Sequence, residues 1–283
     1  MMKYCVAIFT YAQISGYDPY GKPEPIFKSL KDYGYDGVEP GGAPAKIDPI
    51  KYKKLADFYD LEIPTVSHLV CSSSGGDPAS PNERLRGRVV TYYKKCIDMM
   101  VDLNARYTGI NSCPPTEAAG TLRISYDELK KNFMATLKEV LEYGEEKGKY
   151  ILLEPVNRFE AHPAFLNTVR EALSIMDEVG MKNTGVFADL FHMNIEEASI
   201  TGALRNAGKH LRHIHFVDNH RLSPGMGNLN FTEIIQTLKQ IKYGGYLSLE
   251  SYPPKLDPEF LAKFYIQYLR QIEKAVDEQS RLV

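Results

Sequence analysis

The chain has 283 residues, of which 43% are hydrophobic and 25% charged, and these proportions are ordinary for a globular protein. Its formal net charge of −2 argues against a dedicated nucleic-acid-binding protein, because such proteins are usually basic. No segment approaches the roughly 20 apolar residues of a membrane-spanning helix, and the N-terminal apolar run is too short for a signal peptide. The four cysteines are too few for a disulfide scaffold and fit a reducing compartment, so we expect a cytoplasmic protein.

Short apolar segments recur along the whole chain and predict β-strands, because a strand that is buried on both faces is apolar throughout. Eight such segments occur, at residues 4–9, 36–40, 63–69, 107–111, 150–154, 184–189, 211–217 and 246–251. Longer amphipathic segments lie between them and predict α-helices. The chain therefore alternates between strand and helix from one end to the other.

Segment 125–149 is the clearest of the predicted helices. Ser125 is placed as its N-cap, and Glu128 completes the S-x-x-E pattern of a capping box. Gly148 suits the C-terminal end, where a left-handed residue commonly stops a helix. Segments 48–60 and 167–180 have the same form, with a capping residue in front and a turn behind.

Strands that alternate with helices predict a parallel sheet, because each helix carries the chain back to start the next strand. We expect a single α/β domain over residues 1–283, folded as a (β/α)8 TIM barrel, since barrels commonly have about this length. A doubly wound open sheet is the alternative. It would favour a glycine-rich first turn, and the residues that follow the first predicted strand lack a G-x-G-x-x-G pattern.

Acids and histidines stand at the ends of the last four predicted strands. These residues are Glu154, Asp189, His215 and Glu250. In a barrel the carboxyl ends of the strands meet at one face, and that face carries the chemistry. A lone acid there is equally well explained as a solvated strand end. Four on successive strands predict a metal site, and three carboxylates with one imidazole suit Mn²⁺ first, with Mg²⁺ or Co²⁺ as alternatives.

Several interpretations are open for the other polar residues at strand ends. His213 shares a face with His215 but lies deeper, so a hydrogen-bonded core histidine is its preferred interpretation. His68, Glu39 and Asn111 end the third, second and fourth predicted strands. Each is either a substrate contact, a support for such a contact, or an ordinary polar residue at a strand end.

The loops after the predicted ligands also carry polar side chains. Glu160 follows Glu154, His192 follows Asp189, and Arg221 follows His215. The alternative for Arg221 is a solvated loop cation, since the glycines and proline of residues 224–227 indicate a loop. Those glycines match no phosphate-binding motif.

Four segments together resemble the D-tagatose 3-epimerase/D-allulose (psicose) 3-epimerase family of xylose isomerase-like barrels. They are "LEPVNRFE", "DLFHMNIEE", "HIHFVDNHR" and "SLES". The resemblance implies that metal is bound by Glu154, Asp189, His215 and Glu250, and that Glu160, His192 and Arg221 contact or support the substrate. The sequence departs from the family in the loops 71–81 and 111–120, which leaves the substrate open, and His162 has no assigned role.

The activity implied by this resemblance is metal-dependent epimerisation of a ketose at C3, with Glu154 and Glu250 as catalytic acid and base. The sugar is the expected partner, and a homodimer or homotetramer is expected by analogy. Alternatives are an aldose–ketose isomerase, or a dehydratase or lyase acting on a polyol or keto-acid. A nuclease of the endonuclease IV type would need more histidines at strand ends. A non-catalytic sugar-binding barrel is the remaining alternative.

Overall fold

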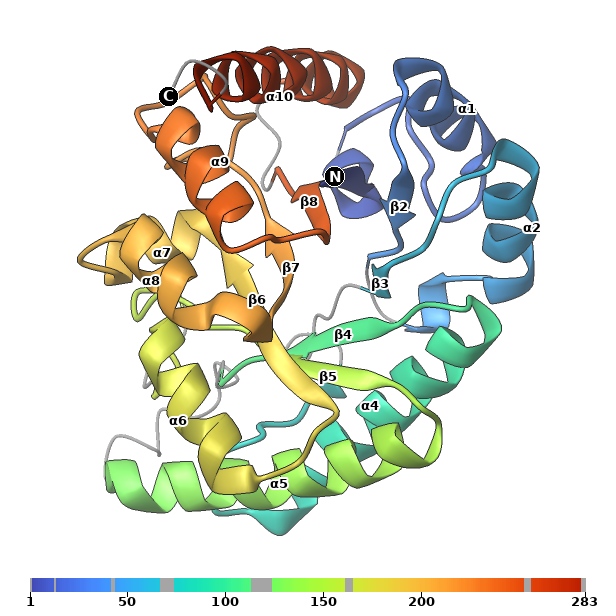
Figure 1. The fold of residues 1–283 in the computed structure, drawn as a ribbon. Helices are drawn as coiled ribbons and strands as arrows, with labels where there is room; N and C mark the ends of the chain where they lie inside the picture. The colour runs from blue at the N-terminus through green and yellow to red at the C-terminus, as the bar shows by residue number, and fades with distance from the viewer. Residues whose placement is uncertain are drawn as a thin grey trace.

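The computed structural model describes residues 2–12, 14–41, 44–66, 74–112, 124–160, 165–251 and 256–280. Within these residues, parallel strands form one curved sheet at the centre of the molecule (Figure 1). They are β1 (Lys3–Ala7), β2 (Gly37–Glu39), β3 (Thr65–Val66), β4 (Tyr107–Ile110), β5 (Tyr150–Leu153), β6 (Thr184–Asp189), β7 (Leu211–His215) and β8 (Tyr246–Leu249). All eight lie inside the segments predicted as strands, apart from Lys3 at the start of β1.

The order of the strands around the sheet is β2-β1-β8-β7-β6-β5-β4-β3. Strand β1 pairs with β8, so the first and last strands lie side by side. An isolated parallel bridge between Gly37 and Glu62 links β2 to the segment just before β3. The sheet is therefore a nearly closed barrel, which confirms the predicted (β/α)8 fold.

Helices surround the strands on the outside of the barrel (Figure 1). In the described part of the chain they are α1 (Glu24–Tyr33), α2 (Pro49–Tyr59), α4 (Glu83–Asp102), α5 (Tyr126–Glu146), α6 (Val169–Val179), α7 (Leu190–Glu196), α8 (Ile200–Ala207), α9 (Phe231–Gln240) and α10 (Pro258–Ser280). Helix α7 is an addition to the simple alternation, because α7 and α8 both lie between β6 and β7. None of these helices is both long and apolar enough to cross a membrane.

Local capping explains where the predicted helices begin and end. The Ser125 side chain accepts a hydrogen bond from the backbone N–H of Glu128 and starts α5. Thr168 and Glu171 form a complete capping box at the start of α6. Gly148 and Gly180 follow α5 and α6 with φ angles of 65° and 66°, which a residue with a Cβ rarely adopts.

A closely packed apolar core fixes the positions of the strands. Ile151, Leu152 and Leu153 of β5 are all 0% exposed, because the barrel interior covers one face of the strand and the helices cover the other. Truncating such a side chain to alanine typically costs about 2–5 kcal/mol. The strand ends, which carry the polar side chains, are therefore held in fixed positions.

Candidate active site and metal centre

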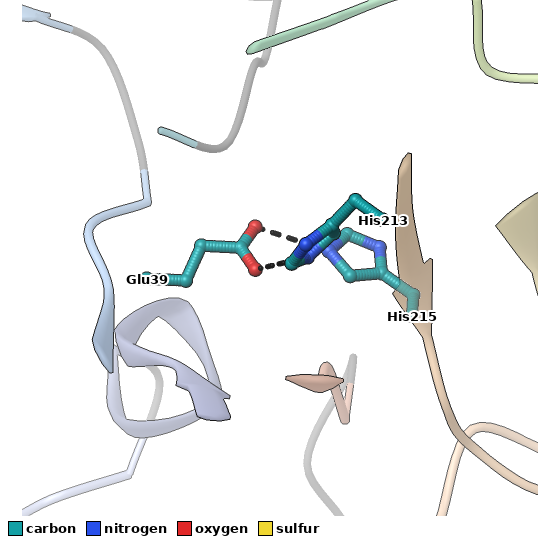
Figure 2. A group of neighbouring side chains, drawn as sticks. All are labelled: Glu39, His213 and His215. Atoms are coloured by element: carbon teal, nitrogen blue, oxygen red, sulfur yellow. Dashed lines mark hydrogen bonds and ion pairs between the residues drawn. The ribbon is translucent and has the colours of Figure 1, made fainter. Parts of the chain in front are cut away.

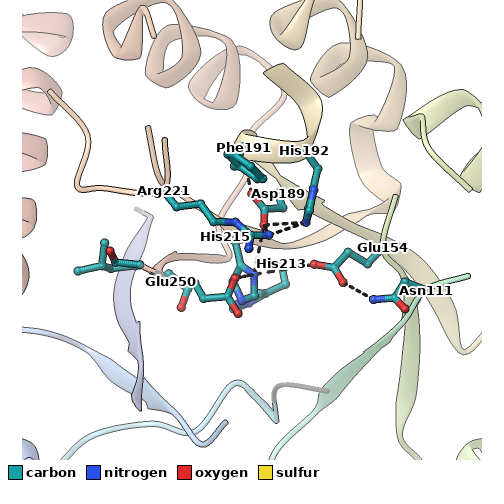
Figure 3. A network of polar contacts seen from close by, with 12 residues as sticks. Asn111, Glu154, Asp189, Phe191, His192, His213, His215, Arg221 and Glu250 are labelled. Atoms are coloured by element: carbon teal, nitrogen blue, oxygen red, sulfur yellow. Dashed lines mark hydrogen bonds and ion pairs between the residues drawn. The ribbon is translucent and has the colours of Figure 1, made fainter. Parts of the chain in front are cut away.

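Four polar side chains converge at the carboxyl ends of neighbouring strands (Figure 3). Asp189 and His215 are the last residues of β6 and β7 and are register partners. Glu154 and Glu250 come directly after β5 and β8. The His215 Nδ1 atom lies 3.2 Å from Glu250 Oε2 and 3.9 Å from both Glu154 Oε1 and Asp189 Oδ2. The structure thus brings together all four residues that the sequence predicted as ligands.

Two atoms in this group lack a hydrogen-bond partner although they are buried. The Nδ1 atom of His215 and the Oδ2 atom of Asp189 form no hydrogen bond within the part of the chain that the structure describes. Burying an unsatisfied polar atom is costly unless something else binds it. Ligand atoms of Asp189, His215 and Glu250 lie within 4.8 Å of one another. This arrangement fits one divalent cation bound by oxygen atoms and a single imidazole nitrogen.

The charges of the group shift the pKa values of two members. Burial alone would lower the pKa of His215, but the carboxylates of Glu250 and Glu39 raise it well above its usual range. Burial raises the pKa of the Asp189 carboxyl, and the cationic forms of His192 and Arg221 only partly offset this effect. The shift of the His215 pKa indicates that carboxylates dominate the charge around this imidazole, and a divalent cation would neutralise part of that charge.

Glu39 does not face the substrate side of the site. Its carboxylate is 0% exposed, and it bonds to the Nε2 atoms of His213 at 3.0 Å and His215 at 3.1 Å (Figure 2). His213 is likewise fully buried, so its preferred interpretation as a hydrogen-bonded core histidine is confirmed. Of the three interpretations open to Glu39, its contacts with His213 and His215 favour a supporting role.

His192 lies beside Asp189, and its two ring nitrogens have different neighbours. Nδ1 lies 3.2 Å from the backbone nitrogen of Asn157 and 2.7 Å from its amide nitrogen, and both of these are donors. The amide orientation is fixed because Asn157 Oδ1 accepts the backbone N–H groups of Phe159 and Glu160. Nδ1 is therefore the acceptor, and a neutral His192 carries its proton on Nε2. Nε2 lies 3.6 Å from Asp189 Oδ2, so this proton points toward the candidate metal site.

Arg221 reaches the same site from the loop after β7. Its Nη2 atom lies 2.8 Å from His192 Nε2, 3.4 Å from Glu160 Oε2 and 3.9 Å from Asp189 Oδ2. Its guanidinium carbon lies 4.3 Å from the centre of the Phe191 ring, a cation–π contact (Figure 3). Arg221 is thus a partly buried cation within the site, and Glu160 touches it from the exposed side.

Asn111 lies beside Glu154, one of the four predicted ligands. Its amide nitrogen donates a hydrogen bond of 3.1 Å to Glu154 Oε2, from the end of the neighbouring strand (Figure 3). This contact orients the Glu154 carboxylate and leaves its other oxygen, Oε1, on the side of His215. His68 and His162, and most of the loop 111–120, lie outside the described residues.

The loop after β5 is attached to helix α7 by the side chains of Arg158 and Glu196. Arg158 forms paired hydrogen bonds with the two carboxylate oxygens of Glu196, at 3.0 and 2.6 Å to Oε2 and 3.1 Å to Oε1. The bidentate geometry fixes direction as well as distance. With the contact between Asn157 and His192, it holds the Glu160 loop against the helix that carries His192.

Asp218 holds the loop that carries Arg221 in place, a role that was not predicted from the sequence. Its buried carboxylate accepts backbone N–H groups from four residues of the loop, namely Asn219, Gly225, Gly227 and Leu229. Such a carboxylate replaces the regular hydrogen bonding that a loop lacks. An acid three residues after a predicted ligand, followed by a glycine-rich loop, was the available signal.

We expect Asp218→Ala to release this loop. The substitution leaves four backbone donors without their acceptor, which costs about 1–3 kcal/mol in the free energy of unfolding. Hydrogen exchange followed by mass spectrometry should show faster exchange of the amides in residues 219–229. Asn219→Ala is the matched control, because its Oδ1 accepts only the N–H of Asn228 among the described residues. Unchanged exchange in Asp218→Ala would contradict the assignment.

Comparison with known proteins agrees with this geometry. Residues 27–272 match the sequence model of the xylose isomerase-like TIM barrel family. The chain therefore belongs to this family.

Within the family, the chain is similar to enzymes named as sugar epimerases. It is 32% identical to a D-psicose 3-epimerase of Enterocloster bolteae over 67% of this chain and 60% of that protein. It is 30% identical to an L-ribulose 3-epimerase of Methylomonas sp. over 80% of this chain and 77% of that protein. It is 26% identical to a 3-dehydro-D-guloside 4-epimerase of Escherichia coli over 86% of this chain and 92% of that protein.

Solved structures of the same kind superpose on almost the whole chain. A structure of L-ribulose 3-epimerase has a TM-score of 0.87 at 24% identity and covers 100% of this chain and 98% of its own, which supports the fold. A D-allulose 3-epimerase from Methylomonas sp. in complex with D-allulose has a TM-score of 0.80 at 25% identity and covers 95% of this chain and 96% of its own. The likeness thus extends well beyond the segment aligned with the D-psicose 3-epimerase.

Proposed function

We propose that this protein is a metal-dependent ketose 3-epimerase, an isomerase that inverts C3 of a ketose through an enediolate. The observation that carries the proposal is the convergence of Glu154, Asp189 and Glu250 on the Nδ1 atom of His215. The relatives named as 3-epimerases support the same reaction. The proposed substrate is a free ketose, since ketohexose and ketopentose epimerases both occur among the relatives.

In this proposal the metal is Mn²⁺, with Mg²⁺ or Co²⁺ as alternatives, held by Glu154, Asp189, His215 and Glu250. When bound, the cation polarises the C2 carbonyl and stabilises the negative charge that develops as C3 loses its proton. Glu154 and Glu250 approach His215 from opposite sides (Figure 3). One carboxylate takes the C3 proton, and the other delivers a proton to the opposite face, which inverts the carbon.

Two further side chains are placed to donate hydrogen bonds to the substrate oxygens. His192 offers Nε2–H, because Asn157 occupies Nδ1. Arg221 offers a guanidinium that always carries a positive charge. The Arg221 Nη2 and His192 Nε2 atoms lie 2.8 Å apart, and neither of them is an acceptor when His192 is neutral. A substrate oxygen that accepts a hydrogen bond from each of them would supply that acceptor, so the two donors suit an anionic or strongly polarised oxygen.

Incubation with ketoses in deuterated water tests this function. Metal-loaded protein is incubated with ketohexoses and ketopentoses, and the sugars are examined by NMR. A parallel sample, from which a chelator has removed the metal, serves as the control. We expect a C3 epimer with deuterium at C3 and no reaction with metal-free protein. Deuterium at C2 of an aldose product, or at C1 of the recovered ketose, would instead identify an aldose–ketose isomerase.

A second candidate is epimerisation at C4 of a 3-keto sugar. It is favoured by the Escherichia coli 4-epimerase, to which the chain aligns over 92% of that protein's length. The chemistry is equivalent, because C4 is adjacent to the C3 carbonyl and the same two carboxylates would exchange its proton. Including 3-keto-glycosides in the panel separates the two activities, since deuterium would then enter at C4.

We further propose that the protein acts in the cytoplasm as a homodimer or homotetramer. Cys5 and Cys96 are buried free thiols, which is compatible with a reducing compartment. Size-exclusion chromatography with light scattering determines the oligomeric state, and a monomeric mass at micromolar concentration would overturn that part of the proposal.

A further inference from the structure

Glu39 is a buried acid outside the four proposed ligands. It ends β2 and reaches the histidines of β7 from the opposite side of the barrel interior (Figure 2). Its two oxygens have separate partners, because Oε1 bonds to His215 Nε2 at 3.1 Å and Oε2 bonds to His213 Nε2 at 3.0 Å. Ser248 Oγ donates a third hydrogen bond, of 2.8 Å, to Oε2. The carboxylate therefore connects strands β2, β7 and β8.

The surroundings leave little freedom to the two imidazoles. The ring of Phe187 makes edge contacts with His213 and His215, with centroid distances of 4.7 and 4.6 Å. Ser248 in turn accepts a hydrogen bond from the thiol of Cys5 at 3.3 Å. All of these side chains are at most 2% exposed, so solvent does not compete for the Glu39 carboxylate.

The hydrogen bonds to Glu39 determine which nitrogen of His215 carries a proton. A carboxylate only accepts hydrogen bonds, so the Nε2 atom that faces it must be protonated. A neutral imidazole has one proton, and Nδ1 is then left with a lone pair. This is the atom that lies among Glu154, Asp189 and Glu250. With Nδ1–H instead, the ring would present a proton to the cation position and could not bind metal.

We propose that Glu39 is a positioning residue of the metal centre, which holds His215 in the Nε2–H form and aims Nδ1 at the cation. The inference rests on the proposed function, because it concerns the same metal. A carboxylate that orients a metal-binding histidine commonly changes metal affinity by about 10–100-fold. Nothing in this role requires contact between Glu39 and the substrate.

His213 and Ser248 explain how an acid can remain ionised in this position. Burial alone would raise the pKa of the Glu39 carboxyl, but His215 and His213 hold it well below its usual range. The Nε2 atom of His213 lies 3.0 Å from Oε2, and because a carboxylate only accepts hydrogen bonds, this nitrogen carries a proton and donates. A neutral His213 that donates from Nε2 satisfies Oε2 and does not compete for the metal. The first histidine of the H-x-H segment, His213, thus supports Glu39.

The test is titration calorimetry with Mn²⁺ alone, on the wild type and on Glu39→Gln. In glutamine one carboxylate oxygen is replaced by an NH₂ group, which is a donor and faces the N–H of an imidazole. At least one of the two histidines must then change its tautomer or lose its hydrogen bond. We expect the Kd for Mn²⁺ to rise about 10–100-fold. Asp77→Asn is the matched control, because Asp77 is also a buried acid (1% exposed) but lies in the loop after β3. Its Kd should equal that of the wild type.

The outcomes separate the two proposals. If the wild type binds Mn²⁺ and Glu39→Gln binds equally well, the role of Glu39 is overturned and the proposed function stands. If the wild type binds no divalent metal, the proposed function fails and the Glu39 proposal with it. Should Glu39→Gln fail to fold, ¹⁵N-histidine NMR of the Mg²⁺- or Zn²⁺-loaded wild type decides. A protonated Nε2 on His215 supports the proposal, and an unprotonated Nε2 overturns it.

Discussion

Glu250→Gln is expected to abolish epimerisation while still allowing the C3 proton of one of the two epimers to exchange with solvent. Removing one of two acid–base groups typically slows proton transfer by about 10²–10⁴-fold. The remaining carboxylate, Glu154, still takes a proton from the face that it reaches, but no group completes the inversion. The measurement is NMR in deuterated water, started separately from each epimer. The variant must be shown to contain metal by elemental analysis.

Glu154→Gln is the reciprocal variant and provides the control. It should exchange the C3 proton of the other epimer, so that the two variants show opposite preferences. The same preference in both would indicate a single base. Full turnover by metal-loaded Glu250→Gln would exclude the two-base mechanism altogether.

Asp189→Asn is expected to remove most of the stabilisation that metal binding gives to the fold, while keeping the stability of the protein without metal. Asp189 Oδ1 accepts the Phe191 N–H at 2.8 Å and caps α7, a role that an amide oxygen retains. The substitution replaces Oδ2, which has no hydrogen-bond partner among the described residues, by an uncharged amide group that is a poor metal ligand. Saturating metal at 100 times Kd should stabilise the wild type by about 2.7 kcal/mol and the variant far less. Thermal denaturation with and without Mn²⁺ measures both effects.

The metal-free form of this variant should be at least as stable as the metal-free wild type at neutral pH. Burial raises the pKa of the Asp189 carboxyl, so its protonated form stabilises the fold at low pH. That contribution is fully present below the unfolded-state pKa of about 4 and is lost as the pH rises through the raised folded-state pKa. Asp77→Asn is again a suitable control. A full metal-dependent gain in Tm for Asp189→Asn would show that Asp189 is not a ligand.

The sequence was sufficient to predict the barrel and the four converging side chains because both depend on local patterns. Strands buried on both faces read as apolar runs, and acids such as Glu154 stand out directly after them. Strand ends meet at one face of any barrel, so convergence follows from topology alone. The lengths were less predictable, since β7 covers only Leu211–His215 of the segment 211–217.

Contacts between distant residues account for what the sequence did not predict. The proton position on His192 depends on how Asn157 is turned, and the function of Glu39 depends on two histidines of β7. Neither pairing leaves a periodic signal. The position of Ser248 was easier to predict. It is two residues before Glu250, and strand alternation places both side chains on one face.

The bond between Glu39 and His213 joins residues that are 174 positions apart. On the ribosome, at about 5–20 residues per second, β2 emerges roughly 10–35 s before its partner on β7 is made. During that time the carboxylate of Glu39 has neither histidine to compensate its burial, and β1 has no β8 beside it. The first strands of the barrel are therefore expected to remain without their closing partners until synthesis nears completion. Metal capture and ring closure should then be late, coincident steps of folding.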